Sequence, residues 1–229
     1  MGIKERRERE REDLRTRIMD AARELIVEQG VEQVSMRKIA ERIEYSPTAI
    51  YQHFADKEDL LRAMCDRDFV ELNERMRARA ADVTDPVEAI VLFGASYVRF
   101  AMEFPSHFRV MFMTPNAHPS EMNEEDKKKQ GDPEQDGYAA FKLVIQAAID
   151  SGRFRNEFND AELVAQVLWG VVHGVACIQV AKQNDPWIRL IPVEQWTRIS
   201  MTVALRGMLK DPADSDRVFE RLSAKGGLL

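Results

Sequence analysis

Apolar residues in this chain recur at three- and four-residue steps, which is the spacing of one face of an amphipathic helix. Leu14, Ile18, Ala22 and Leu25 follow this spacing up to Gly30, a residue suited to end a helix. No segment alternates cleanly between apolar and polar residues with β-branched enrichment, so no strand is expected. The pattern therefore predicts an all-α protein.

A repeated motif marks where helices begin: an Asp followed by Pro, with an acid or amide three residues after the Asp. It occurs over residues 85–88, 132–135 and 211–214. The Asp side chain accepts free N–H groups of a first turn, and Pro loses no hydrogen bond at the first helical position. About nine or ten helices are predicted, over residues 12–29, 36–43, 47–53, 57–82, 86–103, 105–113, 133–151, 160–183, 189–210 and 213–224. Residues 114–132 are expected to form a polar loop.

Composition places the chain among ordinary globular proteins. Its 229 residues are 45% apolar and 31% charged, which suits one large domain or two small ones. No uninterrupted apolar stretch approaches the roughly 20 residues of a membrane-spanning helix. A densely charged start and only two cysteines, Cys65 and Cys177, favour a cytoplasmic protein without a membrane partner.

Motifs for catalysis, cofactors and metals are missing from the sequence. The four histidines form no HExxH motif, and no two of them have the spacing on a helix that binds a metal. There is also no GxSxG, GxxxxGK[ST] or GxGxxG segment. His173 and Cys177 stand four residues apart, but their surroundings predict buried packing. We expect neither an enzyme nor a bound cofactor or metal.

Net charge argues weakly against a nucleic-acid partner. Lys and Arg total 33 and Asp and Glu total 39, which gives −6. Residues 1–64 hold 13 basic and 14 acidic side chains, so even this segment sums to −1. Any interaction with DNA must therefore depend on a local basic face.

The first 54 residues contain two very short helices that only packing can hold in place. Residues 36–43 present Ile39 and Ile43 on one face, and a three-residue break follows. Ser46 then caps a second short helix, with Pro47 at its first position. Two short helices joined by a tight turn fit the helix-turn-helix plan, whose second helix enters the DNA major groove.

The residues around this turn resemble a known family. Residues 46–61, SPTAIYQHFADKEDLL, together with residues 15–30 and 36–40, resemble the tetracycline-repressor (TetR) family of transcriptional regulators. Residues 104–112 and the segment WGVVHG at 169–174 resemble the WHG type of C-terminal domain of one branch of that family. The resemblance implies a charged tail over 1–11, a helix-turn-helix domain over 12–56 and a ligand-binding and dimerisation domain over 57–229.

The chemistry of the second short helix suits DNA. Thr48 and Ala49 are small enough for close approach to base edges, and Thr48 or Gln52 can hydrogen-bond a base or phosphate. Tyr51 and His53 carry donors for phosphate oxygens. By resemblance, the DNA contacts are expected at Arg37, Ser46, Pro47, Thr48, Ala49, Tyr51, Gln52, His53 and Lys57.

Several of these assignments have plain alternatives. Tyr51 can brace the core instead, and His53 can be an ordinary surface histidine. The N-terminal run over residues 4–17 can act as a minor-groove arm, or as a solvated, frayed or helical tail because its acids balance its bases. Glu44 occupies a turn position where the family often has Gly. A non-Gly residue with positive φ costs about 1–2 kcal/mol, so either the turn differs or packing absorbs the strain.

The larger domain offers a candidate site for a small-molecule effector. Residues 86–113 are rich in aromatic and thioether side chains, which line ligand pockets and equally fill ordinary cores. We expect an apolar or aromatic molecule to be enclosed by Tyr97, Phe100, Phe108, Phe112, Trp169 and His173. His173 supplies the polar contact or simply packs.

A homodimer is expected, because dimers read two half-sites of a palindrome. Two apolar stripes are candidates for its interface: Ala165, Trp169, Val172, Ala176 and Val180, and Trp196, Ile199, Val203 with Leu205 or Met208. The sequence thus predicts a repressor released from a palindromic double-stranded DNA operator by an effector, although nothing in the chain fixes whether the ligand relieves or promotes binding. The alternative is a TetR-fold helical sensor or adaptor that no longer binds DNA.

Overall fold

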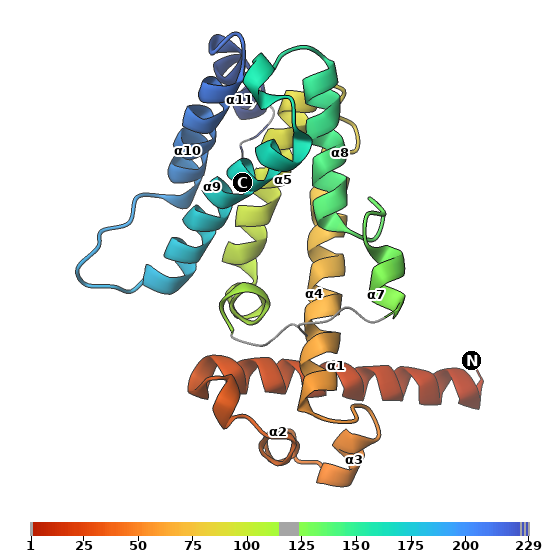
Figure 1. Cartoon of the computed structure of the whole chain (residues 1–229). Coiled ribbons are helices and arrows are strands. Elements are labelled where there is room, and N and C mark those ends of the chain that lie inside the picture. The colour runs from red at the N-terminus through yellow and green to blue at the C-terminus, as the bar shows by residue number, and fades with distance from the viewer. Residues whose placement is uncertain (1, 115–123, 225, 227, 229) are drawn as a thin grey trace. The chain divides into compact units, whose positions relative to one another are not determined.

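The computed structural model describes residues 2–114, 124–224, 226 and 228, and these are helical almost throughout (Figure 1). The α-helices are α1 (Ile3–Gln29), α2 (Met36–Arg42), α3 (Pro47–Tyr51), α4 (Lys57–Ala80), α5 (Pro86–Glu103), α6 (Pro105–Phe108), α7 (Glu124–Lys129), α8 (Gly137–Asp150), α9 (Ala161–Lys182), α10 (Val193–Met208) and α11 (Ala213–Ala224). The described residues form no strand, and one isolated bridge joins Phe154 to Leu209. The prediction of an all-α protein with an N-terminal helix-turn-helix is confirmed.

The chain divides by its internal contacts into two compact units. The first comprises residues up to 69 and the described residues 106–114, and the second comprises residues 70–105 and those from 124 onward. Helix α4 therefore runs from one unit into the other, and so does the chain after α5. The boundary expected at residue 57 falls inside the first unit by this division.

Several element boundaries differ from the prediction, including the start of α10 at Val193 and the end of α3 at Tyr51. Helix α1 begins at Ile3, so the expected tail is helical. Part of the expected loop forms α7, while residues 115–123 lie outside the described part of the chain. Helix α8 begins at Gly137 because Asp136 caps it, accepting from the backbone N–H groups of Tyr138 and Ala139 at 2.9 and 3.1 Å. Asp132 closes the preceding turn instead.

The core of the first unit lies under α3. Ile18, Ile39, Ile50 and Phe54 are fully buried there with side chains from the start of α4. Val110, from the π-helical turn η2 (Arg109–Met113), is buried in the same cluster. The segment that follows α5 is therefore built into the core that supports the short helices.

A buried ion pair ties this unit together. The Arg23 guanidinium of α1 donates to both carboxylate oxygens of Asp68 of α4 at 3.1 Å, and both side chains are almost completely buried. His107 of α6 lies 2.8 Å from the same carboxylate through Nδ1. Since a buried charge must stay paired, this contact fixes α1, α4 and α6 against one another.

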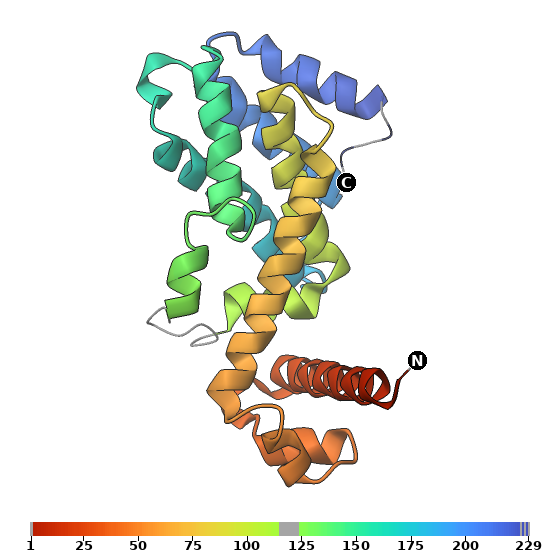
Figure 2. The same cartoon turned by 90° about the vertical axis from the view of Figure 1, so that its right-hand side faces the viewer.

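The second unit is a helical bundle around α5, which packs against α8, α9 and α10 (Figure 2). Helix α5 is buried along nearly its whole length. Gly94 permits the close approach, because a Cβ there would lie 2.8 Å from Met201 Cε and 3.1 Å from Val172 Cγ1. Any larger residue at this position would force the Met201 side chain to move.

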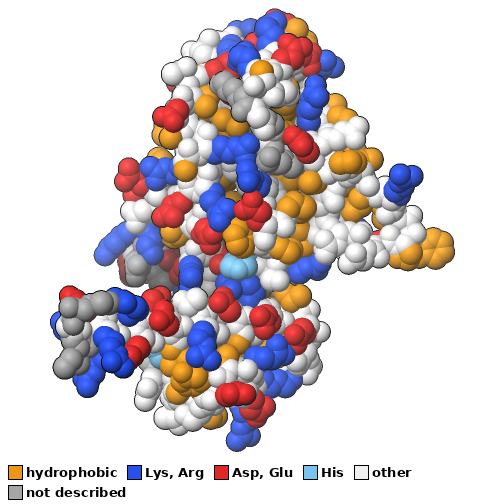
Figure 3. Space-filling model, turned by 180° about the vertical axis from the view of Figure 1, so that it is seen from behind, with side chains coloured by type: hydrophobic (Ala, Val, Ile, Leu, Met, Phe, Trp, Pro, Cys, Tyr) orange, Lys and Arg blue, Asp and Glu red, His pale blue; other side chains and the backbone are white. Residues whose placement is uncertain are grey.

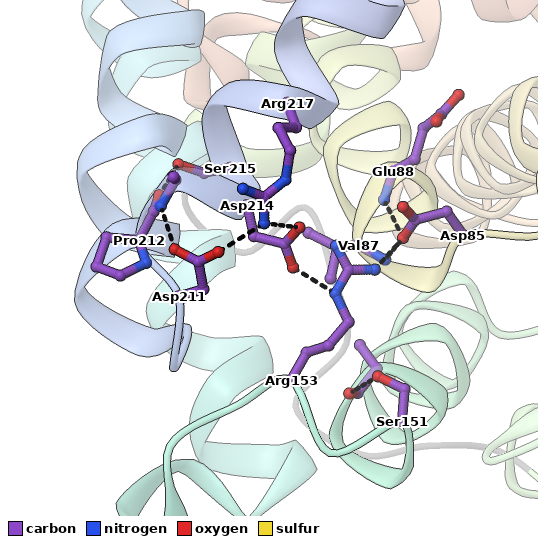
Figure 4. A network of polar contacts seen from close by, with 12 residues as sticks. Asp85, Val87, Glu88, Ser151, Arg153, Asp211, Pro212, Asp214, Ser215 and Arg217 are labelled. Atoms are coloured by element: carbon purple, nitrogen blue, oxygen red, sulfur yellow. Dashed lines mark hydrogen bonds and ion pairs between the residues drawn. The ribbon is translucent and has the colours of Figure 1, made fainter.

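A charged network closes one end of the bundle (Figure 4). Arg153 pairs with Asp85 at the start of α5 and with Asp214 of α11, and Arg217 also pairs with Asp214. Burial by itself raises the pKa of Asp85. Arg153 and the first-turn N–H groups that Asp85 caps lower this pKa by more, so it lies below its usual value. The network holds the α8–α9 connection and α11 against α5.

Helix α9 is long and apolar enough, by length and composition, to cross a membrane. It packs against α5, α8 and α10, and 44% of its most apolar window is buried inside the protein. One helix of this kind is weak evidence of a membrane span, because a helix packed in a protein core passes the same test.

Many residues of the two apolar stripes predicted for the dimer interface are buried inside the chain instead of exposed. Ala165, Val172, Ala176 and Val180 of α9 are buried within the chain itself, as are Leu205 and Met208 of α10. Exposed apolar residues lie on the outer faces of the two helices: Leu163, Val167 and Ile178 on α9, with Ile199 and Val203 on α10. Apolar residues occur on both faces of α9, so spacing alone did not separate the inner face from the outer.

Candidate nucleic-acid interface and ligand cluster

The two short helices begin with matching serine caps. The Ser35 hydroxyl accepts from the Lys38 backbone N–H at the start of α2, and the Ser46 hydroxyl accepts from the Ala49 backbone N–H at the start of α3, both at 3.3 Å. Pro47 occupies the first turn of α3. These caps fix where α3 begins, and with it the direction in which its side chains project.

The turn between α2 and α3 contains a strained residue. Glu44 has φ 61°, the only positive φ of a non-glycine residue in the described chain. The Tyr45 N–H donates to the Ala40 carbonyl and the Glu44 N–H to the Glu41 carbonyl, the bond pattern of a helix end that glycine usually provides. The turn therefore keeps the glycine-like shape, with a left-handed backbone at an exposed glutamate.

One side of α3 is open to solvent. Ser46, Pro47, Thr48, Tyr51 and Gln52 are exposed, and Tyr51 is 54% exposed. Ala49 is half-buried and Ile50 is fully buried on the opposite side. Tyr51 therefore does not brace the core, and the polar side chains form a continuous exposed face.

Arg37 and Lys38 differ in their freedom. Arg37 is exposed in the first turn of α2 and has no side-chain partner among the described residues. The ammonium group of Lys38 donates to the Gln29 side chain and the Gln33 carbonyl at 3.0 and 2.7 Å. Arg37 alone of the two keeps its donors available for an anion.

His53 and Lys57 are bound to their surroundings. Nζ of Lys57 donates to the Val31 carbonyl at 2.7 Å, which uses one of its three donors inside the protein. Burial lowers the pKa of His53, and the positive charges of Arg11 and Arg15 lower it further. His53 therefore stays neutral near pH 7 and offers a phosphate a hydrogen bond but no charge.

Arg15 is a residue of this region that sequence reasoning missed. Its guanidinium donates to the His53 carbonyl at 3.0 Å and lies 4.3 Å from the centroid of the Phe54 ring. Arg15 follows the same three- and four-residue spacing as the core positions of α1, which was the available signal. It holds the end of α3 against α1.

In the second unit, three helices contribute to a polar and aromatic cluster. The hydroxyl of Tyr97 of α5 lies 2.7 Å from Nδ1 of His173, and Nε2 of His173 lies 3.2 Å from Sγ of Cys177. The Trp169 ring lies 5.4 Å from the His173 ring and 6.3 Å from that of Tyr138 of α8. The cluster brings together three of the six predicted ligand contacts, counting Tyr97, Trp169 and His173.

The donor and the acceptor of each hydrogen bond in this cluster can be assigned. Burial raises the pKa of Tyr97, and a hydrogen bond from Trp169 opposes that rise. Because an indole N–H only donates, the Tyr97 oxygen accepts it and the Tyr97 proton goes to His173 Nδ1. Nε2 of His173 then carries its own proton toward Cys177. Burial also lowers the pKa of His173 and raises that of Cys177, so a neutral imidazole faces a protonated thiol, which is unsuited to nucleophilic chemistry.

The remaining predicted ligand contacts lie elsewhere. Phe100 is buried and contacts Phe104, with ring centroids 5.3 Å apart. Phe108 and Phe112 belong to the first unit, where they contact each other and Phe112 contacts Phe69. The six residues therefore do not form one cluster within one unit.

Comparison with known proteins agrees with this architecture. Residues 18–64 match the family model for bacterial regulatory proteins of the tetR family, and residues 90–191 match that for the tetracyclin repressor-like C-terminal domain. The chain belongs to the TetR family of transcriptional regulators. The WHG branch stays a prediction.

Individual relatives are more distant. The HTH-type transcriptional regulator UidR of Escherichia coli K12 is 38% identical over 81 residues, which span 35% of this chain and only 38% of UidR. A Rhodococcus sp. RHA1 protein of unknown function has a TM-score of 0.68 at 20% identity, over 86% of this chain and 96% of that one. The SmeT–triclosan complex has a TM-score of 0.63 at 21% identity, over 86% and 92%. At these identities the solved structures show the fold alone.

The strain at Glu44 generates a prediction about stability. Glu44→Gly should raise the free energy of unfolding by about 1 kcal/mol, because glycine adopts positive φ without the Cβ clash. Urea unfolding followed by circular dichroism measures the change. Glu44→Ala removes the same charge but keeps the Cβ, so it should bring no comparable gain; equal gains in both variants would show that charge rather than strain matters here.

Proposed function

We propose that this protein is a ligand-responsive, DNA-binding transcriptional repressor that leaves a palindromic operator when a small apolar or aromatic molecule binds. The observation that carries the proposal is the exposed polar face of α3, which stands on a buried core and is flanked by Arg37. Membership of a family of transcriptional regulators supports it. In this proposal residues 12–56 read DNA, and residues 57–229 bind the effector and dimerise.

The individual contacts divide by chemistry. Thr48, Ala49 and Gln52 are proposed to reach base edges, because small and amide side chains read the major groove. Arg37, Tyr51 and His53 are proposed to contact phosphates. Ser46 and Pro47 position the start of α3, and Lys57 uses the donors that Val31 leaves free.

This division predicts two different mutant phenotypes. Arg37→Gln should weaken binding to all sequences alike and reduce the slope of log K against log salt by about one per subunit. Thr48→Ala should change which base is preferred within the half-site. The probe is a duplex that the wild-type protein selects from a random library, titrated by fluorescence anisotropy at two salt concentrations.

Arg42→Gln is the matched control, because Arg42 also lies on α2 but pairs with Glu24 and Glu28. This variant should bind DNA like the wild type. If the wild-type protein selects no duplex from the library, the alternative of a sensor or adaptor that does not bind DNA is favoured and the proposal fails.

A homodimer through the outer faces of α9 and α10 is proposed next. These faces carry exposed apolar residues on two adjacent helices, and Val203 is 67% exposed. Two copies packed by these faces form a four-helix interface, as family members are known to dimerise.

Val203→Asp should turn the dimer into a monomer at low micromolar concentration, measured by analytical ultracentrifugation. The dissociation constant should rise at least about 100-fold, because a two-fold interface buries two unpaired carboxylates. Leu143→Asp is the control, since Leu143 of α8 is similarly exposed at 59% but lies outside these faces. Dissociation by the Leu143 variant alone would place the interface on α8.

The effector is proposed to bind against Tyr97, Trp169 and His173. This cluster combines aromatic surface with oriented hydrogen bonds, which suits a small aromatic molecule with a polar group. The solved SmeT complex holds triclosan within the same fold. Binding there would favour one arrangement of α5, and the shift is limited by the differential affinity of the ligand for the two states.

Tyr97→Phe tests this site. The effector concentration for half-maximal release of DNA should rise about tenfold, the effect of one lost hydrogen bond, with DNA affinity unchanged in its absence. The effector is the most active member of a panel of simple phenols and fatty acids, judged by release of the wild-type protein. Tyr138→Phe, which also lies against Trp169 but bonds to Glu162, should leave release unchanged; equal shifts in both variants would contradict the assignment.

A further inference from the structure

The N-terminal part of α1 is a helix that its own apolar residues do not hold. Residues 4–13 contain no apolar side chain, yet the helix is continuous from Ile3 and is exposed up to Asp13. Charged side chains of both signs cover this projecting end (Figure 3). It offers no hydrophobic surface for a protein partner or a membrane.

The charges on this segment are sorted by sign around the helix. Lys4, Arg7, Arg11 and Arg15 are separated by three, four and four residues, so they form one stripe along the helix. Ile18 and Ala22 continue the same stripe into the core of the first unit. The cationic stripe is therefore the extension of the side of α1 that faces α2 and α3.

Contacts confirm which way this stripe faces. Arg15 reaches the end of α3, donating to the His53 carbonyl and stacking on Phe54. Arg11, one turn earlier, is close enough for its charge to act on His53. Helices α1 and α3 belong to the same compact unit, and Figure 1 shows α1 extending past α3.

The cations of the stripe are available, unlike others on the same helix. Lys4, Arg7 and Arg11 are exposed and have no side-chain partner among the described residues. Arg6, on another side of the helix, is paired with Glu10 at 2.7 Å. Glu8 and Glu12 border the stripe on one side without pairing with it among the described residues, so its charge is reduced but not cancelled.

We propose that Lys4, Arg7 and Arg11 form a second DNA-contacting element, a rigid helical rail that binds backbone phosphates beside the half-site read by α3. Eleven residues separate Lys4 from Arg15, which is about 16 Å of helix, or about five base pairs of duplex. The rail contacts phosphates without reading bases, and it extends the footprint on one side of each half-site. The proposal rests on the proposed DNA-binding function.

The test compares two duplexes and two faces of the helix. The long duplex is the one selected by the wild-type protein, with at least ten flanking base pairs on each side, and the short duplex is trimmed to the two half-sites. The Arg7→Gln/Arg11→Gln double variant should bind the long duplex about fivefold more weakly for each contact removed at 0.15 M salt, with a shallower salt slope. Its affinity for the short duplex should equal that of the wild type.

Arg6→Gln is the matched control, since it removes a cation from the same helix outside the stripe. It should bind both duplexes like the wild type, and circular dichroism should show that the helix persists in every variant. If the wild type discriminates between long and short duplexes no better than the double variant, the rail is overturned while the proposed function stands. If the wild type binds neither duplex, both fail together.

Discussion

Helix α3 spans only five residues, and a helix of that length cannot persist in water without packing. Its position depends on Ile50 and Phe54, which are buried beneath it, and on Arg15, which donates to the His53 carbonyl just after the helix and lies over the Phe54 ring. The base contacts proposed for α3 depend on this support, because a rotation of α3 redirects Thr48 and Tyr51 together. The core of the first unit is thus the part of the molecule that sets sequence recognition.

The same core contains side chains that follow α5 closely in the sequence. Val110 is buried in it, and His107 contacts the Asp68 carboxylate that Arg23 of α1 holds. Both residues follow α5 directly in the chain, and α5 carries Tyr97 of the ligand cluster. In the proposed function, the chain that follows α5 is the route by which effector binding would act on side chains that α1 and α4 hold.

Much of this arrangement was predictable from the sequence because it follows local rules. The serine caps and the burial of Ile50 follow from residue type and spacing, whereas the shape of the turn at Glu44 was left open. The start of α8 was not predicted correctly, because Asp132 and Asp136 can both cap a helix. Only the geometry of the turn selects Asp136. The length of α1 was also missed, since its first turns are charged and give no apolar periodicity. The grouping of Phe108 and Phe112 with Phe69 is a tertiary contact that no local pattern contains.

The acidic net charge and a DNA-binding function are compatible because pairing, not composition, decides which charges act outward. Arg23, Arg42 and Arg153 each lie against carboxylates, so they contribute little to the field around the molecule. Arg7, Arg11 and Arg37 have no such partner among the described residues, and all three belong to the unit that contains α3. An anion that binds at α3 therefore has unpaired cations of the same unit available to it, although the chain as a whole is acidic. A count of charges along the sequence does not separate paired from unpaired cations. The structure separates them, because it shows where the carboxylate partners lie.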